Sequence, residues 1–426
     1  MALELLAVGD IHLGRTPQGL PAGFEPERFS PRAAWLEAVE EALRRKVDAV
    51  VLLGDVVDHD RNFLEAYSPL RQGSERLLAA GIQVVAVVGN HDVEVLPRLA
   101  NEITGLRLIG RGGAWEALEL GGRDGSTLRL VGWSFPRPRV TEDPLASMPA
   151  ALRGRTNVPT LGLVHGELDA SASYHAPLRR SLLAACGFDG WLLGHVHQPT
   201  LESSKDSIGY LGSLVGLDAG ETGRRGPWSV RVEANGTLRL EHLPLARLRW
   251  EGLELALDAN SAPEQVESQL VRLFETAAND PARQWGSAEL VAVRLVVRGR
   301  CRGRREIVQR LRELGQGEPI TTGSLVFFLE KLEDRTQPEL DLETLSKQHH
   351  AAGGLARRLL ALQAPESTER AALLRKARAC EDKLRSVPSF ALPEFGESDD
   401  EALVRELSEQ GFALLERLVQ GEGGGA

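Results

Sequence analysis

The stretch VDAVVLLGDVVD, residues 47–58, joins a buried strand to a polar turn. Its core AVVLL is apolar without alternation, which is typical of a strand covered on both faces. A glycine and then Asp55 follow at once. The same arrangement recurs at ELLAVGD (4–10) and IQVVAVVGN (82–90), and helical patterns such as WLEAVEEALRR (35–45) lie between these runs. This alternation predicts an α/β domain with a largely buried sheet.

Further strand-like runs extend this pattern, and loops with glycine and proline separate them. They are TLRLVGWSF (127–135), PTLGLVHGE (159–167) and GWLLGHVH (190–197). So many strands favour two sheets packed face to face. We therefore expect residues 1–245 to form an α/β domain, a two-sheet sandwich flanked by helices.

The pattern changes after Pro244. Strand-like and helical runs alternate over residues 246–335, beginning with LRWEGLELAL at residue 248, which predicts a small α+β domain. Residues 336–426 read as amphipathic helices, with the proline-containing linker SVPSFALPEFGES at 386–398. The final GEGGGA, residues 421–426, predicts a disordered tail.

Composition limits the class of protein. The three cysteines, Cys186, Cys301 and Cys380, lie far apart and form no CxxC pattern, which indicates a reducing compartment. The N-terminus has no basic segment before its short apolar run, and no later run has the length of a membrane span. We expect a cytoplasmic protein without membrane contact.

Charge bears on nucleic-acid binding. The net charge of −10 argues against a chain that coats nucleic acid indiscriminately, because phosphate binding needs local lysine and arginine. One arginine-rich stretch runs from Arg294 to Arg312 and contains a single acid. It is either a solvated strand edge and helix face or a surface that holds DNA.

Polar residues of one kind follow the strand-like runs. In an α/β fold, residues just past the carboxyl ends of neighbouring strands converge on one crevice. We therefore expect a single site there. Its candidate residues are Asp10, His12, Asp55, Asn90, His91, His165, His195 and His197.

The types of these residues indicate metal chemistry. The set has too many oxygen donors for a structural zinc site, which prefers four thiolate and imidazole ligands. A mixed nitrogen and oxygen set suits two divalent ions, with manganese preferred and iron or zinc possible. Two such ions can share one carboxylate, for which Asp55 is the candidate, and clamp a phosphoryl group.

The ordered motifs GDIH, GDVVD, GNHD, VHGE and GHVH resemble the signature of the calcineurin-like metallophosphoesterases over about residues 1–215. Within that superfamily, the DIHLG start and the appended α+β segment resemble the SbcD-like DNA repair nucleases. Those nucleases work with a coiled-coil ATPase of the SbcC type.

This resemblance implies roles for individual residues. One metal ion would be held by Asp10, His12, Asp55 and His197. The other would be held by Asp55, Asn90, His165 and His195. His91 would contact the scissile phosphate and assist departure of the leaving group, and Asp92 would orient the His91 imidazole. Some relatives have a histidine three residues after the bridging aspartate; this chain has Asp58 there, followed by His59, whose part in substrate positioning stays open.

The resemblance also implies partners. The α+β domain at 246–335 would cap the nuclease cleft, and helices of 336–426 would bind the ATPase. Their apolar spacing equally suits packing on the chain's own body. The segments FLEAYSPLRQGSERLLAAG (63–81) and EVLPRLANEI (94–103) lie where the family forms its homodimer.

The resulting hypothesis is a two-metal-dependent DNA phosphodiesterase, an exonuclease and endonuclease that processes DNA ends in double-strand break repair together with an SMC-like ATPase. Two alternatives stay open. The same chemistry could act on a phosphoprotein, a cyclic nucleotide or another small molecule. Alternatively, the chain could be a non-catalytic scaffold that binds DNA ends. The presence of His91 argues against this, because a scaffold needs no residue to assist a leaving group.

Overall fold

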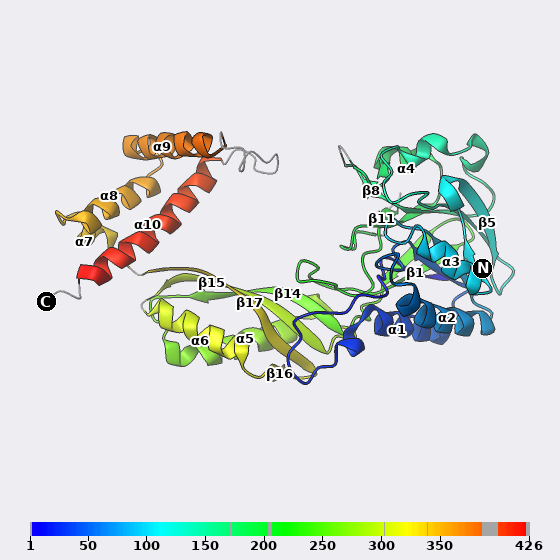
Figure 1. Ribbon diagram of the computed structural model, residues 1–426, viewed down its shortest axis with the longest axis horizontal. Coiled ribbons are helices and arrows are strands. Elements are labelled where there is room, and N and C mark those ends of the chain that lie inside the picture. Colours follow the sequence, from blue (N-terminus) through cyan, green and yellow to red (C-terminus); the bar gives the residue numbers. More distant parts are fainter. Residues whose placement is uncertain are drawn as a thin grey trace. The chain divides into compact units, whose positions relative to one another are not determined.

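The computed structural model describes most of the chain, namely residues 2–170, 173–202, 207–301, 303–338, 340–385 and 399–422. It divides into two compact units (Figure 1). The first comprises Met1–Gly252, Phe274–Arg294 and Glu318–Glu330, and the second comprises Leu253–Leu273, Leu295–Gly317 and Lys331–Ala426.

A six-stranded sheet in the first unit contains the stretch 47–58. Its strand order is β13-β12-β1-β2-β3-β4. Strands β1 to β4 are parallel, and β12 and β13 add antiparallel strands beside β1. The strands are β1 (Ala2–Val8), β2 (Ala49–Leu53), β3 (Gln83–Val87), β4 (Leu106–Leu108), β12 (Trp228–Glu233) and β13 (Leu238–His242).

A second sheet has five strands in the order β11-β10-β7-β6-β5. All are parallel to their neighbours except β5, which pairs antiparallel with β6. The strands are β5 (Trp115–Gly121), β6 (Thr127–Trp133), β7 (Thr160–His165), β10 (Gly190–Gly194) and β11 (Ile208–Tyr210). The short strands β8 (Glu167–Leu168) and β9 (Pro177–Leu178) form a separate pair.

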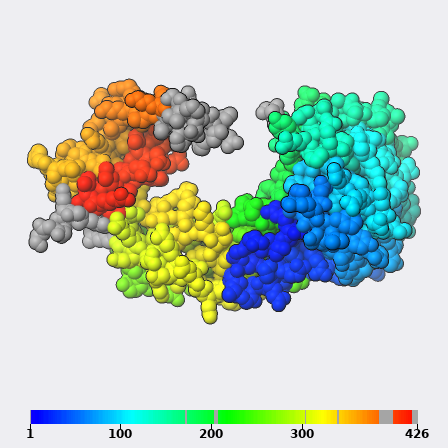
Figure 2. Space-filling model, viewed as in Figure 1, coloured from blue at the N-terminus to red at the C-terminus, as the bar shows by residue number. Residues whose placement is uncertain are grey.

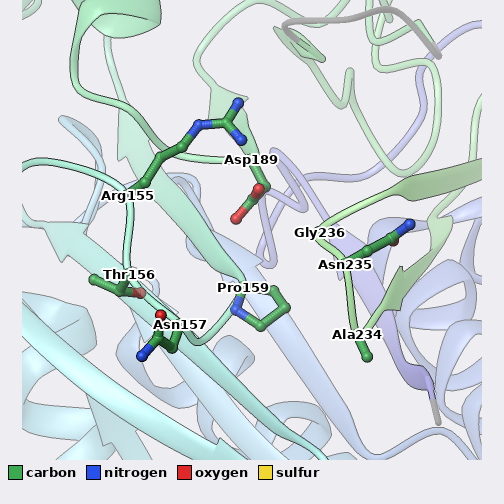
Figure 3. A pocket seen from close by; sticks show the side chains of 8 residues that line it. All are labelled: Arg155, Thr156, Asn157, Pro159, Asp189, Ala234, Asn235 and Gly236. Carbon is green, nitrogen blue, oxygen red and sulfur yellow. The ribbon is translucent and has the colours of Figure 1, made fainter.

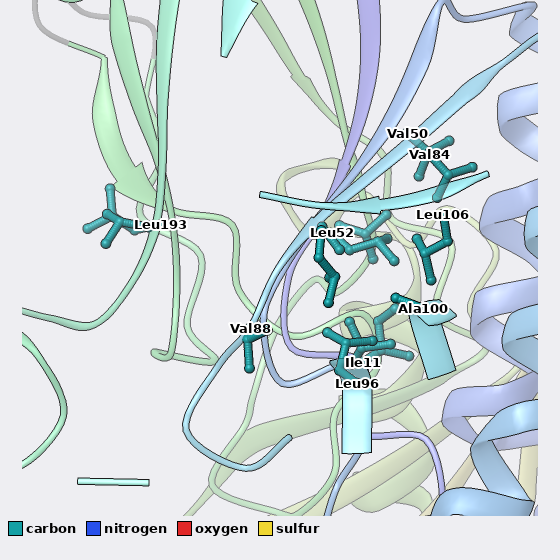
Figure 4. Close-up of a cluster of buried hydrophobic side chains, with 14 of the residues drawn as sticks. Ile11, Val50, Leu52, Val84, Val88, Leu96, Ala100, Leu106 and Leu193 are labelled. Atoms are coloured by element: carbon teal, nitrogen blue, oxygen red, sulfur yellow. The ribbon is translucent and has the colours of Figure 1, made fainter. Parts of the chain in front are cut away.

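The two sheets pack face to face. In β2 alternate side chains point to opposite faces, so Val51 enters a core shared with Leu163 of β7 and Leu192 of β10. Val50 and Leu52 enter the other core, between the sheet and the helices, where Figure 4 shows Val50 beside Val84. Burial on both faces explains why this strand is apolar without alternation.

Helices cover the outer faces of the sandwich. They are α1 (Pro31–Arg45), α2 (Phe63–Ala79), α3 (Val95–Glu102) and α4 (Arg180–Ala185). Helix α1 begins where Ser30 Oγ accepts from Ala33 N at 3.2 Å, an N-cap. The buried Trp35 of α1 donates from Nε1 to Pro69 O of α2 at 2.9 Å, which holds the two helices side by side.

The next part of the chain forms a four-stranded sheet in the order β14-β15-β17-β16, and two helices lie between its strands along the chain. In the first unit, Phe274 and Phe327 stack with ring centroids 4.8 Å apart. The elements are β14 (Leu248–Leu257), α5 (Val266–Ala278), β15 (Leu290–Cys301), α6 (Arg304–Gln316), β16 (Ile320–Thr322) and β17 (Leu325–Pro338).

The end of the chain is helical. Helices α8 and α10, orange and red in Figure 2, pack through Leu359, Phe412 and Leu415. The amphipathic faces thus pack on each other. The helices are α7 (Leu342–Ser346), α8 (Ala351–Gln363), α9 (Thr368–Arg385) and α10 (Asp400–Glu422).

Three features of the prediction have different outcomes. The fold class, an α/β sandwich flanked by helices, is confirmed. The predicted tail at 421–426 begins too early, because α10 runs to Glu422; residues 423–426 and the linker 386–398 lie outside the described residues. The domain boundaries at 245 and 335 stay predictions.

Membrane crossing requires a helix that is both long and apolar. Among the helices of the described ranges, none meets both conditions.

Gly162 of β7 offers a test of core packing. A Cβ there would lie 2.1 Å from Cε3 of Trp191, a fully buried side chain that also donates from Nε1 to Leu183 O at 3.0 Å. We expect Gly162→Ala to lower the free energy of unfolding by about 1 to 3 kcal/mol through overpacking. Chemical denaturation followed by tryptophan fluorescence measures this change.

Gly121→Ala is the matched control, since Gly121 lies in β5 of the same sheet and a Cβ there meets no atom within 4 Å. Equal stability of the two variants would contradict the packing described for Trp191.

Candidate metal centre

The predicted site residues of both sheets lie at one edge of the sandwich. Asp10, Asp55 and Asn90 follow the ends of β1, β2 and β3, while His165 ends β7. The two sheets meet where His165 Nδ1 donates to Leu53 O, the last carbonyl of β2, at 2.9 Å.

Among the described residues three groups of donor atoms form at this edge, and the group of His12, Asp58 and His91 shares His12 with one of the other two. The first of these other two contains Asp10, His12 and His197, and the second contains Asp55, His165 and His195. Within each group the donor atoms all lie within 4.8 Å of one another. The first and second groups coincide with the division that the resemblance implies, and the assignment of ligands to ions stays a prediction.

The backbone at the site is strained. Asp10, His12, Asp55 and His195 all have positive φ angles, of 41°, 56°, 47° and 105°. Residues other than glycine seldom adopt this region, and they keep it where the surroundings enforce it, often at functional sites. The strain turns these side chains into the crevice immediately after each strand ends.

Glycines let the backbone approach these side chains closely. A Cβ on Gly89 would lie 2.1 Å from Asp55 Oδ1, and one on Gly194 would lie 2.0 Å from Leu53 O. The glycines that follow the strands therefore make room for the donor groups.

The hydrogen bonds of the first group fix the imidazole tautomers. His12 Nδ1 donates to Asp58 Oδ1 at 3.1 Å, and His197 Nδ1 donates to Glu221 Oε1 at 2.7 Å. Each neutral ring then carries a lone pair on Nε2, and these two Nε2 atoms lie 3.0 Å apart. Two lone pairs facing each other repel unless a proton or a cation lies between them.

In the second group, too, hydrogen-bond acceptors face one another without a donor between them. With its Nδ1 donating to Leu53, His165 carries its free lone pair on Nε2, which lies 3.0 Å from Asn90 Oδ1 and 3.3 Å from Asp55 Oδ2. His195 Nδ1 lies 3.2 Å from the same Asn90 oxygen. Several acceptor atoms therefore converge on one point.

Protonation resolves this conflict when no metal is bound. Burial lowers the pKa of His165, but the charge of Asp55 and its hydrogen bond raise that pKa to about 9. Burial raises the pKa of Asp55, whereas His165 brings it below its usual range. For His195, burial and then the charge of His165 lower the pKa to about 3.

The donor set fits divalent cations. A cation can take the place of the proton between His165, Asn90 and Asp55, and it can occupy the space beside the facing Nε2 atoms of His12 and His197. Buried Asp10 also favours a nearby cation, because burial raises the pKa of its carboxyl and, within the described ranges, the hydrogen bond to it comes from the amide of His195 at 2.9 Å. Carboxylate, amide and imidazole donors together suit divalent ions of the first transition row.

His91 lies exposed at the rim of the site. Its ring meets that of His12 edge to face, with centroids 5.1 Å apart. Its Nδ1 donates to Asp58 O at 2.8 Å. The other nitrogen, Nε2, is therefore the one that can exchange a proton with a bound group, and it can give one when the ring carries both protons.

The expected role of Asp92 needs correction. Its fully buried carboxylate accepts from Gly89 N at 2.8 Å and from Val56 N at 2.7 Å. These bonds tie the turn after β3 to the turn after β2. The orientation of the His91 ring comes instead from the Asp58 carbonyl, because the Asp92 oxygens already accept from backbone amides.

Asp58 supports the site twice, with its carboxylate on His12 and its carbonyl on His91. His59 is exposed, and its Nδ1 accepts from Arg61 N at 3.3 Å within its own loop. Of these two neighbours, Asp58 is thus the residue that touches the candidate centre.

Sequence reasoning missed two residues. Glu221, in the loop between β11 and β12, contacts His197 as described above. His175 meets His195 edge to face, with ring centroids 4.9 Å apart. Neither lies in a recognisable motif; both reach the centre through loops that only the folded chain brings close.

The arginines between Arg294 and Arg312 are largely paired with carboxylates. Arg294 contacts Glu330 at 3.0 Å within the first unit. Within the second unit, three further pairs are Arg298 with Glu254, Arg304 with Glu416, and Arg310 with Glu267. This pairing favours the solvated strand edge and helix face over a DNA surface.

A separate cavity of about 210 Å³ opens near the start of β7 and β10, at the opposite ends of these strands from the histidines (Figure 3). Arg155 and Asp189 line it. The Asp189 carboxylate already accepts from Thr160 N at 2.8 Å, so this cavity offers little chemistry.

Comparison with known proteins finds a family likeness for the part of the chain that carries the candidate metal centre. Residues 3–199 match the family model of the calcineurin-like phosphoesterases. This part of the chain is thus similar to the calcineurin-like metallophosphoesterases, a family that uses divalent metals.

Individual relatives are distant. An uncharacterized metallophosphoesterase of Bacillus subtilis, YhaO, is 26% identical over 310 residues, which are 70% of this chain and 72% of that protein. The DNA double-strand break repair protein Mre11 of Methanopyrus kandleri is 23% identical over 376 residues, 81% of this chain and 76% of that protein. Among solved structures, a dimetal phosphatase from Danio rerio is 14% identical, with a TM-score of 0.34, over 54% of this chain and 92% of that one.

The proton on His165 predicts how metal binding depends on pH. Below pH 9 the metal-free ring is protonated, so a cation must displace that proton, and affinity should rise about tenfold per pH unit up to about pH 9. Calorimetry with Mn²⁺ at pH 7.5, in two buffers of different ionisation enthalpy, measures the protons released. A heat of binding that is the same in both buffers would contradict this assignment.

Proposed function

We propose that the chain is a two-metal-dependent DNA phosphodiesterase that cleaves DNA as an exonuclease and an endonuclease. The observation that carries the phosphoesterase part is the pair of donor groups at one edge of the sandwich with His91 exposed beside them. This arrangement supplies cation ligands and a proton donor within one crevice.

The residues of the chain divide the work. The group of Asp10, His12 and His197 and the group of Asp55, His165 and His195 would hold the cations, which would lower the pKa of a bound water and neutralise the phosphoryl oxygens. When both of its ring nitrogens are protonated, His91 would give its Nε2 proton to the leaving oxygen and become neutral, since its Nδ1–H is occupied by the Asp58 carbonyl. Asp92 keeps the turns after β2 and β3 in register.

DNA as the substrate rests on a weaker observation. The Methanopyrus relative named for double-strand break repair aligns over 81% of this chain, well beyond residues 3–199. A second Mre11, from Aeropyrum pernix, is 35% identical over 89 residues. A role in DNA repair is the corresponding proposal, with manganese as the preferred metal and the cytoplasm as the location.

We further propose a homodimer and a coiled-coil ATPase partner. Helix α2 presents the exposed Leu64 within the segment 63–81, where the dimer is expected. In the second unit α8 and α10 use much of their apolar surface on each other, while Leu414 of α10 stays half exposed. That surface is where we expect the ATPase to bind.

Cleavage of DNA by the purified protein with Mn²⁺ tests the proposal. We expect His91→Gln to slow cleavage about 10² to 10⁴-fold, because it removes the proton donor and leaves the cation ligands in place. Gel assays on single- and double-stranded DNA measure this, and metal content is measured in parallel. His349→Gln is the control, since His349 is exposed and outside every motif.

Other outcomes would identify the alternatives. Failure to cut either form of DNA with any divalent ion, with and without the ATPase, would overturn the nuclease proposal. A preference for p-nitrophenyl phosphate over bis(p-nitrophenyl) phosphate would point to a phosphomonoesterase. Cells whose DNA repair survives His91→Gln would point to a scaffold.

A further inference from the structure

We propose that Glu221 is a positioning residue that orients His197 and makes the group of Asp10, His12 and His197 the tighter of the two metal sites. This inference rests on the proposed metal-dependent function. It concerns a residue outside every motif, 24 positions along the chain from the histidine it contacts.

The Glu221 carboxylate is fully engaged and nearly buried, with 11% of its side chain exposed. Oε1 accepts from His197 Nδ1 at 2.7 Å. Oε2 accepts from Ser213 Oγ at 2.9 Å and from Leu217 N at 3.1 Å. Two donors from the loop, Ser213 and Leu217, and the His197 ring itself therefore fix both oxygens, and the His197 ring has a single orientation.

The loop that carries Glu221 is itself anchored. Ser213 N donates to His197 O at 3.0 Å, which closes one end of the loop on the site. At the other end Thr222 forms a bridge with Trp250, whose Nε1 donates to Gly216 O at 3.1 Å. A rigid loop holds a carboxylate in place better than a mobile one, so Glu221 is suited to orienting a ligand.

The two donor groups differ in what stands behind their imidazoles. In the first group both Nδ1 atoms donate to carboxylates, His12 to Asp58 and His197 to Glu221. In the second group His165 Nδ1 donates to a neutral carbonyl, that of Leu53. A carboxylate partner makes the imidazole a stronger base and adds negative charge near the cation, so the first group should bind metal more tightly.

The pKa values of the pair agree with this contact. Burial lowers the pKa of His197, and its hydrogen bond to Glu221 together with nearby carboxylates raises it above its ordinary value. Burial raises the pKa of Glu221, but the hydrogen bond and charge of His197 bring it below its ordinary value. Both shifts reflect the same contact of 2.7 Å between His197 Nδ1 and Glu221 Oε1.

Glu221→Gln tests the inference. The substitution keeps the size of the side chain and an oxygen acceptor, while it removes the charge behind His197. Calorimetric titration of the metal-free full chain with Mn²⁺ should show two equivalents for the native protein, the first tighter. In Glu221→Gln we expect the first equivalent to bind about 10 to 100-fold more weakly and the second to change little.

Electron paramagnetic resonance of bound Mn²⁺ gives a readout that does not depend on activity. At one equivalent of metal, the spectrum of the native protein should be that of Mn²⁺ in one defined site. In Glu221→Gln the ion should distribute over both sites, and the spectrum should broaden. Asp218→Asn is the matched control, because Asp218 lies on the same loop and its carboxylate accepts from Gly220 N at 2.8 Å. It should titrate like the native protein.

Two results would overturn the inference. If Glu221→Gln binds both equivalents as the native protein does, or weakens only the second, Glu221 does not set the tighter site, and the proposed phosphodiesterase stands. If the native protein binds no Mn²⁺, the metal-dependent function falls as well. Equal thermal unfolding of the metal-free proteins shows that any change in titration is not a loss of fold.

Discussion

The structure of the site depends on acceptor atoms held against one another. The Nε2 atoms of His12 and His197 lie 3.0 Å apart, and Nε2 of His165 lies 3.0 Å from the Asn90 oxygen. Such contacts are unfavourable unless protons or cations separate the atoms. The folded chain must therefore supply enough stability from its core to hold a centre that is complete only with its cations.

That stability comes from the sandwich. Strands such as β2 are buried on both faces, in a core between the sheets and another beneath the helices. The burial of apolar side chains offsets the backbone strain at Asp10, His12, Asp55 and His195. Glycines such as Gly89 allow this geometry, because a side chain there would occupy the place of the Asp55 carboxylate.

The sequence predicted those parts of the molecule that follow from local pattern. Apolar runs that end in polar residues were enough to predict the strands and the convergence of Asp55, Asn90 and His165. Contacts made across loops were not predictable in this way. Glu221 reaches His197 because the loop folds back over 24 residues, and no periodicity or motif encodes that return. Asp92 was expected to contact His91 because the two residues are adjacent in sequence. Side chains of adjacent residues point in different directions, and the Asp92 carboxylate contacts backbone amides instead.

The metal centre accounts for the type of reaction, but it does not account for the choice of substrate. The donor groups are buried or half-buried and converge on one another, so they would bind cations and, through them, a phosphoryl group, whatever ester carries it. Choice among esters must come from surfaces around this centre. The Arg294–Arg312 stretch cannot serve by charge alone, since acids such as Glu330 and Glu267 pair with its arginines. The net charge of −10 makes a large general DNA-binding surface unfavourable as well. A DNA substrate would therefore be held mainly by the cations at the scissile phosphate and by few protein charges, and its binding should depend on metal more strongly than on salt.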